Sequence, residues 1–383
     1  MLKIITVFGT RPEAIKMAPL VKELAKCRGE IDCKVAVTAQ HREMLDQVLA
    51  LFEIRPDYDL DIMRRRQTLF DITCRALAGL REVFEAEKPG LVLVHGDTTT
   101  TFAAALAAYY LQIPVGHVEA GLRTRDKFSP FPEEINRRLT GALADLHFAP
   151  TANARRNLLG EGVRGENIFV TGNTVIDALL ATVKPGYIFA DPVLSRIDYE
   201  NRRVLLITTH RRENLGGPMR EIYQALREVV ENYRDVEVVF PVHKNPAVRN
   251  VVSEELGGLD RVRLIEPLDY QPFANLIKHS YLVLSDSGGL QEEAPALGKP
   301  VLVLRGTTER PEAVDAGTVR LVGTGRETVV SETRRLLDDS VFYGKMANAA
   351  NPYGDGFASK RIIQAIKHKF GISGETFEEF RPC

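Results

Sequence analysis

The sequence has few cysteines and no excess charge of either sign. Its four cysteines, Cys27, Cys33, Cys74 and Cys383, show neither metal-binding nor redox spacing. We therefore expect reduced, unreactive thiols in a cytoplasmic protein. Lysine and arginine number 50 and aspartate and glutamate 51, which gives a formal net charge of −1. This balance disfavours nucleic acid or a membrane surface as a partner.

Long apolar runs and targeting signals are also missing. No run approaches the roughly eighteen apolar residues of a membrane helix. The first residues, MLKIITVFGT, lack a signal-peptide pattern and lead directly into a predicted strand. The eight histidines are scattered, with no helical pair suited to zinc, so we predict no metal site.

The common nucleotide-binding motifs are absent or misplaced. There is no Walker A sequence. One literal dinucleotide fingerprint runs from Gly160 through Gly162 to Gly165, but it follows a predicted helix and precedes a predicted strand. The mechanism of that motif requires the reverse order. Nicotinamide-dependent and P-loop ATPase activities therefore lose most of their support.

Apolar strands alternate with helices through most of the 383 residues, a length that favours two domains. The predicted strands are 4–8, 35–38, 91–94, 113–118 and 168–170, then 204–208, 236–241, 262–265, 281–285 and 300–304. Helices are expected at 16–26, from about Thr174, and at 358–369. Segment 184–202 has little periodicity and separates the two series, in or just beyond the inter-domain region. The pattern predicts an α/β protein with two Rossmann-like domains facing across a cleft.

Three acidic residues lie at predicted element ends in the first half. Asp97 follows strand 91–94, Glu119 follows strand 113–118, and Glu133 begins a helix with Pro132 at its first position. Each has a structural explanation: Asp97 could cap a helix, and Glu133 with Glu134 could form ion pairs four residues along. Ligands bind outside the carboxyl ends of parallel strands, so the convergence of Asp97 and Glu119 favours a site.

Phosphate-binding signals occur in both halves. In the second, Ser287, Gly288 and Gly289 follow a strand and open a helix, with Glu293 further in where it could bind ribose hydroxyls. Arg310 could add positive charge. The alternative is an ordinary tight turn with a solvated acidic face.

The first half places Arg11 and Lys16 around a helix start after the first strand, which suits a diphosphate. Either could be a surface cation. His210 and His243 follow two strands of the second half at equivalent positions.

These stretches resemble the non-hydrolysing UDP-N-acetylglucosamine 2-epimerases. The resemblance rests on FGTRPEAIKMAPL, TAQHREMLDQVL, VHGDTTTT, GHVEAGLRT, PFPEEINRR, GNTVIDALL, DSGGLQEEAPALGKPVLVLR, TTERPEAV and NPYGDG. It implies a GT-B-like fold with domains at 1–172 and 173–357, the last helix (358–383) joining the first. It also implies interconversion of UDP-N-acetylglucosamine and UDP-N-acetylmannosamine in the cytoplasm for surface polysaccharides, by a homodimer without cofactors.

The resemblance assigns roles residue by residue. The acid–base candidates are Asp97, Glu119, Glu133 and His210. The nucleotide would be bound by Arg11, Lys16, His210, His243, Phe273, Ser287, Gly288, Gly289, Glu293 and Arg310. A second, activating UDP-N-acetylglucosamine would meet Gln40, His41 and Arg66, with Glu43 standing where some members have glutamine. Leu268 likewise stands where some members have glutamine.

The implied chemistry explains the residue types. The proton on the sugar's second carbon is not acidic, because no carbonyl adjoins it. Loss of that proton together with UDP avoids an unstabilised carbanion, and it needs a carboxylate base and cations on the diphosphate. Three alternatives remain: a GT-B glycosyltransferase, a hydrolysing epimerase and a non-catalytic nucleotide-sugar sensor.

Overall fold

The computed structural model describes residues 1–374 and 377–382, which form two compact α/β units. Unit 1 comprises residues 1–180 and 353–381, and unit 2 comprises residues 181–352 and Pro382. The sequence-based division stood at 172/173 and 357/358. Segment 184–202 lies within unit 2. Cys383 is outside the described residues.

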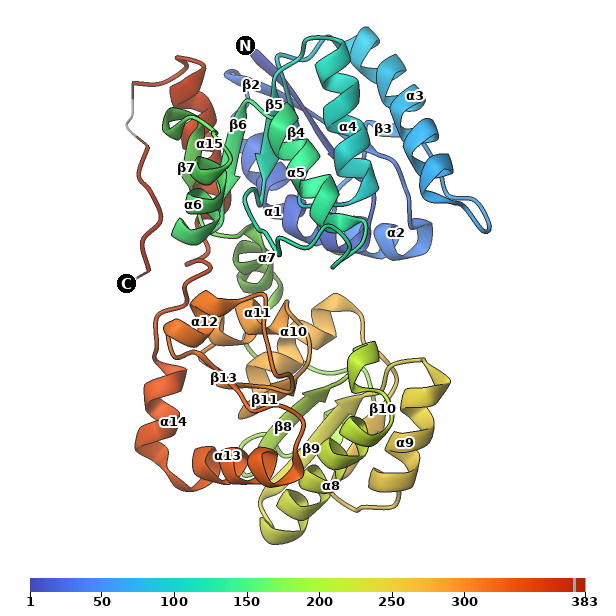
Figure 1. Cartoon of the computed structure of the whole chain (residues 1–383), viewed down its shortest axis with the longest axis vertical. Helices are drawn as coiled ribbons and strands as arrows, with labels where there is room; N and C mark the ends of the chain where they lie inside the picture. Colours follow the sequence, from blue (N-terminus) through green and yellow to red (C-terminus); the bar gives the residue numbers. More distant parts are fainter. Residues whose placement is uncertain (375–376, 383) are drawn as a thin grey trace. The chain divides into compact units, whose positions relative to one another are not determined.

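Unit 1 is built on a seven-stranded parallel sheet (Figure 1). Its strand order is β3-β2-β1-β4-β5-β6-β7. Successive strands are added on one side of β1 up to β3 and on its other side from β4 onwards, so the strand order reverses between β1 and β4. The strands are β1 (Leu2–Phe8), β2 (Ile31–Val37), β3 (Tyr58–Asp59), β4 (Leu91–His95), β5 (Val115–Val118), β6 (Leu146–Ala149) and β7 (Ile168–Val170). Ligand sites of open α/β sheets lie at such reversals, outside the carboxyl ends of the strands.

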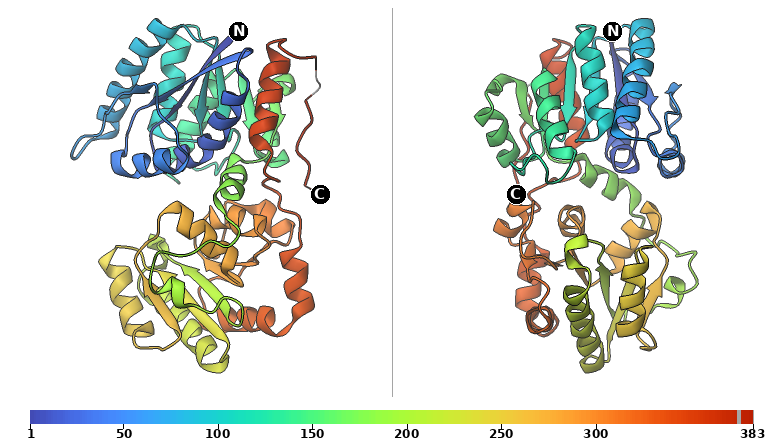
Figure 2. Two further views of the ribbon diagram at one scale, coloured as in Figure 1. Left: turned by 180° about the vertical axis from the view of Figure 1, so that it is seen from behind. Right: turned by 45° about the vertical axis from the view of Figure 1, so that its right-hand side comes forward.

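Helices cover both faces of this sheet, which explains why its central strands are continuous apolar runs. The helices α3, α4 and α5 pack side by side, and α1 packs against α2 and the C-terminal α15 (Figures 1 and 2). The helices of unit 1 are α1 (Arg11–Lys26), α2 (Arg42–Leu51), α3 (Leu69–Glu87), α4 (Thr99–Tyr110), α5 (Glu133–Leu143), α6 (Ala152–Gly160), η1 (Gly165–Asn167), α7 (Thr174–Thr182) and α15 (Ala358–Lys369).

Unit 2 contains a six-stranded parallel sheet of order β10-β9-β8-β11-β12-β13. Its strands are β8 (Arg203–Thr208), β9 (Val236–Pro241), β10 (Val262–Ile265), β11 (Leu282–Ser285), β12 (Val301–Val303) and β13 (Val319–Leu321). Its helices are η2 (Leu194–Arg196), η3 (Arg212–Asn214), α8 (Gly217–Asn232), α9 (Pro246–Leu256), α10 (Tyr270–His279), α11 (Leu290–Ala296), α12 (Pro311–Asp315), α13 (Arg326–Asp338) and α14 (Ser340–Ala347).

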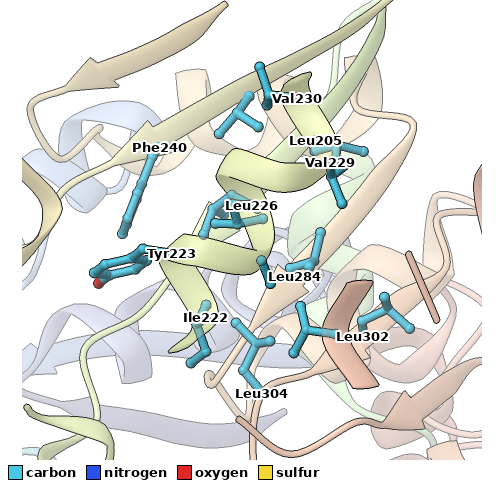
Figure 3. Close-up of a cluster of buried hydrophobic side chains, with 14 of the residues drawn as sticks. Leu205, Ile222, Tyr223, Leu226, Val229, Val230, Phe240, Leu284, Leu302 and Leu304 are labelled. Atoms are coloured by element: carbon cyan, nitrogen blue, oxygen red, sulfur yellow. The ribbon is translucent and has the colours of Figure 1, made fainter. Parts of the chain in front are cut away.

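The core of unit 2 forms where α8 packs on the sheet. Ile222, Leu226 and Val229 recur at helical spacing along α8, are fully buried, and lie among leucines of the strands (Figure 3). An apolar stripe at this spacing is typical of a helix that buries one face against a core. Tyr223 of the same helix packs against Phe240 of β9, with ring centroids 5.7 Å apart.

Several predicted boundaries were wrong. Helix α1 begins at Arg11 rather than at residue 16, because Thr10 and Glu13 form a capping box. Pro132 is the N-cap of α5, not its first residue, and Gly289 is the N-cap of α11. The short strands β3, β6 and β13 were not predicted.

Among the described residues, we find no helix with the length and apolar content that crossing a bilayer requires.

Candidate active site

A pocket of about 410 Å³ opens at the carboxyl ends of β1, β4 and β5 in unit 1. It is lined by residues from the turns that follow these strands and from the starts of α1, α2 and α5. Many of the predicted site residues share it: Arg11, Lys16, Gln40, His41, Asp97, Glu119 and Glu133. Gly9 permits the close packing beneath it, since a Cβ there would lie 1.9 Å from the Thr38 hydroxyl.

Glu119 adopts a strained backbone and is surrounded by polar groups. Its φ angle is +63°, a left-handed conformation that costs a residue with a side chain on the order of 1 kcal/mol or more. Its carboxylate forms an ion pair with Lys16 and accepts a hydrogen bond from Asn173 Nδ2 at 2.8 Å. His95 Nε2 lies 3.9 Å away. Backbone strain of this kind clusters at functional sites, which supports the prediction that Glu119 is a site residue.

Asp97 is held by an arginine rather than used as a helix cap. The N-cap of α4 is Thr98, whose hydroxyl accepts from Thr101 N. Arg137 donates from both Nε and Nη2 to Asp97 Oδ2, at 2.9 and 2.7 Å. The capping alternative for Asp97 is therefore wrong, and Arg137 is the residue that orients this carboxylate.

Glu133 and its neighbour have different surroundings. Glu133 Oε2 is buried and has no hydrogen-bond partner within the part of the chain that the structure describes. Glu134 is almost fully buried and accepts from the backbone N–H groups of Thr124 and Arg125 and from Arg137 Nη1. The predicted surface pairing of these acids is wrong: Glu134 anchors a loop, and Glu133 is left to face the pocket.

Glu13 is a fourth carboxylate residue lining this pocket, and it was not selected from the sequence. It is 2% exposed and receives hydrogen bonds from Gly9 N and Thr10 N, and from the hydroxyls of Thr98 and Thr101. Burial raises its pKa, and the hydrogen bonds oppose that rise. It joins the turn after β1 to the start of α4. The T-x-x-E capping box was its only signal in the sequence.

Buried histidines support the turn that carries Asp97. His117 Nε2 donates to the Gly96 carbonyl at 2.7 Å, and burial lowers the pKa of His117 to about 3. His95 lines the pocket at 3% exposure, and neither ring nitrogen has a hydrogen-bond partner among the described residues. Burial lowers the pKa of His95 to about 4. Both rings are therefore neutral near pH 7.

The residues predicted to bind a second nucleotide divide into two groups. Gln40 and His41 line the pocket, and Gln40 is buried with its Oε1 accepting from the Thr100 hydroxyl at 3.0 Å. Glu43 and Arg66 are exposed and do not line it. Arg66 has a φ of +56° within the turn that precedes α3.

In unit 2 the structure brings His210 and His243 together beyond the ends of β8 and β9. Their rings stack with centroids 6.0 Å apart at 25°. Asp286, at the end of β11, accepts from the backbone N–H groups of His210 and Arg211. The Arg211 guanidinium also donates to the Asp286 carbonyl and to Glu309.

The Ser287–Gly289 turn is open on one side. A Cβ built on Gly288 would meet nothing closer than Arg211 Nη2 at 4.0 Å, and one on Gly289 would lie 3.5 Å from Glu293 Oε2. Gly289 also has ordinary helical backbone angles. Neither the space nor the backbone conformation at these two positions requires glycine.

The remaining nucleotide-binding candidates contact neighbouring side chains. Glu293 accepts from the Tyr270 hydroxyl at 3.1 Å, and Arg310 forms an ion pair with the buried Glu292. Phe273 is partly buried in the first turn of α10. Within residues 1–374 and 377–382 no group of three or more histidine, cysteine or acidic side chains is arranged to hold a metal ion.

Comparison with known proteins identifies the family. The model of the family described as UDP-N-acetylglucosamine 2-epimerase matches residues 22–367. The Bacillus subtilis UDP-N-acetylglucosamine 2-epimerase is 58% identical over 379 residues, covering 99% of this chain and 98% of that protein. A Listeria monocytogenes structure assigned the same activity is 55% identical, with a TM-score of 0.94 and 99% of each chain covered.

A further solved relative carries the nucleotide sugar. The Neisseria meningitidis UDP-GlcNAc 2-epimerase, solved bound to UDP-GlcNAc, is 52% identical with a TM-score of 0.87, covering 96% of this chain and 100% of that one. These structures confirm the expected α/β, GT-B-like fold with two Rossmann-like domains. The chain therefore belongs to the UDP-N-acetylglucosamine 2-epimerase family.

Proposed function

We propose that this chain interconverts UDP-N-acetylglucosamine and UDP-N-acetylmannosamine. The observation that carries the proposal is the set of three carboxylates, Asp97, Glu119 and Glu133, around one pocket at the carboxyl ends of the unit 1 strands. Family membership supports the substrate, since a relative of 52% identity was solved with UDP-GlcNAc bound.

The reaction proceeds by elimination and re-addition. A carboxylate takes the proton from the sugar's second carbon, a double bond forms to the first carbon, and UDP leaves with the electrons of the broken carbon–oxygen bond. UDP then adds back to this 2-acetamidoglucal, and a proton is delivered to the opposite face of the second carbon. More than one acid is needed, because removal and delivery occur on different faces.

The three acids have different hydrogen-bond and ion-pair partners, which supports different roles for them in the reaction. Arg137 keeps Asp97 oriented, and Lys16 and Asn173 orient Glu119. The buried Glu133 Oε2 has no such partner among the described residues. Within unit 1, Arg11 would bind a phosphate group of the nucleotide. Within unit 2, the Ser287–Gly289 turn, His243 and Arg310 would bind phosphate and so stabilise the leaving group.

Solvent exchange tests the mechanism. In heavy water, the epimer formed from either substrate should carry deuterium at the second carbon, detected by mass spectrometry and NMR, and a small amount of UDP should appear. A product without solvent deuterium would indicate transient oxidation or internal return of the proton, and would overturn the elimination mechanism.

Product analysis separates the alternatives. A glycosyltransferase would leave a UDP-sugar unchanged until an acceptor is supplied. A hydrolysing epimerase would release free N-acetylmannosamine and stoichiometric UDP. A sensor would bind the nucleotide without turnover. We expect an equilibrium mixture of the two UDP-sugars without any acceptor.

Regulation and assembly extend the proposal. A second UDP-N-acetylglucosamine would bind near Gln40, His41, Glu43 and Arg66 and activate the enzyme. The enzyme would act as a cytoplasmic homodimer and supply precursors of surface polysaccharides. Gln40 and His41 line the pocket, and this position supports the proposed binding of a second UDP-N-acetylglucosamine.

A further inference from the structure

We propose that Asp286 is a positioning residue that fixes the tautomer of His210, so that His210 Nε2 is left free to exchange a proton. This inference rests on the proposed function for its consequence in catalysis, but the tautomer can be measured independently of activity. Asp286 lies directly after β11 and His210 two residues after β8, and these strands pair so that Ser285 and Thr208 are opposite one another.

Asp286 is a fully buried carboxylate that contacts His210 through both backbone and ring. His210 Nδ1 lies 3.2 Å from Asp286 Oδ1. The His210 backbone N–H reaches both carboxylate oxygens, at 3.1 and 3.0 Å. Arg211 N and Asn214 Nδ2 donate to Oδ2 at 2.9 and 3.1 Å. Burial works to raise the pKa of Asp286, but the hydrogen bonds from His210 and Arg211 outweigh it and hold that pKa below its ordinary value.

The hydrogen bonds from the backbone N–H groups of His210 and Arg211 and from the Asn214 amide all point to the Asp286 carboxylate, which therefore acts as an acceptor. An ionised aspartate has no hydrogen to give, and the ring nitrogen beside it must therefore carry one. In neutral His210 this places the hydrogen on Nδ1 and leaves the lone pair on Nε2. In catalytic triads, an acidic side chain next to histidine Nδ1 likewise fixes the tautomer in which Nε2 acts as the base.

His243, stacked on His210, is held in the opposite tautomer. Its Nδ1 accepts from the backbone N–H of Asn245 at 3.2 Å, so the neutral ring carries its hydrogen on Nε2. The two stacked rings thus offer one bare nitrogen and one N–H. A base and a hydrogen-bond donor for a phosphate oxygen are the two functions that the proposed reaction requires of them.

Asp286 also stabilises the 210–214 turn, so its structural contribution must be measured separately. Asp177 provides the matched control. It is also a buried aspartate and accepts two backbone N–H groups, from Ala358 at 3.2 Å and Ser359 at 2.8 Å, but no histidine ring. Asp286→Asn and Asp177→Asn therefore lose the same charge from similar surroundings, and only the first disturbs His210.

The experiment reads the tautomers by NMR of protein labelled with ¹⁵N-histidine at a pH where the rings are neutral. His210→Gln and His243→Gln assign the signals. In the unmodified chain we expect His210 protonated on Nδ1 and His243 on Nε2. In Asp286→Asn, His210 should shift towards the Nε2-protonated form while His243 is unchanged, and Asp177→Asn should leave both rings unchanged.

Kinetics supply the second readout. Asp286→Asn should lower kcat by at least about tenfold, and by up to about 10⁴-fold as in other oriented-histidine sites, with little change in KM. Asp177→Asn should keep kcat within about twofold. A His210 protonated on Nε2 in the unmodified chain would overturn the proposal, even if Asp286→Asn fails to fold. An unchanged tautomer or unchanged kcat in Asp286→Asn would overturn it too. Absence of epimerisation in the unmodified chain would instead overturn the proposed function and leave the tautomer result standing.

Discussion

Single residues of the unit 1 pocket combine backbone strain, ion pairing and one unpartnered buried oxygen. Glu119 carries the strain, Asp97 is held by Arg137, and the buried Glu133 Oε2 has no hydrogen-bond partner among the described residues. The surroundings of each acid therefore differ from those of an acid that caps a helix or forms a surface ion pair. This difference makes the roles of the acids testable one at a time.

Replacement of the acids should separate chemistry from binding. Asp97→Asn and Glu119→Gln keep the shape of each side chain but remove the ionisable group. We expect kcat to fall on the order of a hundred- to ten-thousand-fold while UDP affinity changes little, since positioned proton transfer contributes that much. Steady-state assays and calorimetric titration with UDP measure the two effects. Glu85→Gln, an exposed acid paired with Arg81 on α3, is the control. Near-normal rates would show these acids to be structural.

Adjacent arginines of α5 should differ in their effect on stability. Arg137→Ala leaves the nearly fully buried Glu134 and the partly buried Asp97 without their cation, and should lower the free energy of unfolding by about 3 to 5 kcal/mol. Arg138 is 54% exposed and lies 4.0 Å from Glu161, so Arg138→Ala should cost less than about 1 kcal/mol. Denaturant unfolding measures both. Equal effects would contradict the burial argument.

At the scale of elements, three neighbouring strands each carry a buried histidine: His95 on β4, His117 on β5 and His147 on β6. The last two are directly opposite in register. Burial lowers their pKa values to about 4, 3 and 4, from an ordinary 6.5. The sheet therefore folds around neutral rings that would be protonated in an unfolded chain at mildly acidic pH.

This arrangement predicts a loss of stability in acid. Between about pH 6.5 and pH 4 the unfolded chain binds protons at these positions and the folded chain does not. The free energy of unfolding should therefore fall as pH falls, by up to about 1.4 kcal/mol per pH unit for each histidine.

Denaturant unfolding of His147→Gln between pH 7 and pH 4.5 checks the assignment. The variant should lose about one third of the three histidines' combined contribution to this slope. The exposed His368→Gln on α15 should keep the slope unchanged. An unaltered slope in His147→Gln would contradict the assignment.

At the scale of the whole molecule, activation by a second nucleotide should appear in the time course of the reverse reaction. UDP-N-acetylmannosamine alone should react after a lag, which a trace of UDP-N-acetylglucosamine abolishes. Activation should be retained but weakened, because in the proposed second site Glu43 would put an acid near the diphosphate, which is unfavourable unless the acid contacts a sugar hydroxyl. Glu43→Gln should shorten the lag. Immediate full-rate turnover without the other epimer would exclude the activating site.

The sequence by itself determined the alternating α/β pattern and the acids at the strand ends. Strands buried on both faces must be apolar, and parallel strands bring their carboxyl ends to one edge, so Asp97 and Glu119 could be placed together before any coordinates. The family motifs extended this to the nucleotide-binding residues. Their roles stay predictions, because geometry locates a side chain without showing its reaction.

Only the tertiary structure decided which partner each charged group meets. Arg137 reaches Asp97 across 40 positions, Thr98 reaches Glu13 across 85, and His210 reaches Asp286 across 76. Helical spacing suggested nearer partners for Arg137, and burial of Glu13, His95 and Asp286 has no local signature. Periodicity reports which face of an element is buried, whereas a hydrogen bond between distant residues depends on how the strands are ordered and how their ends are packed.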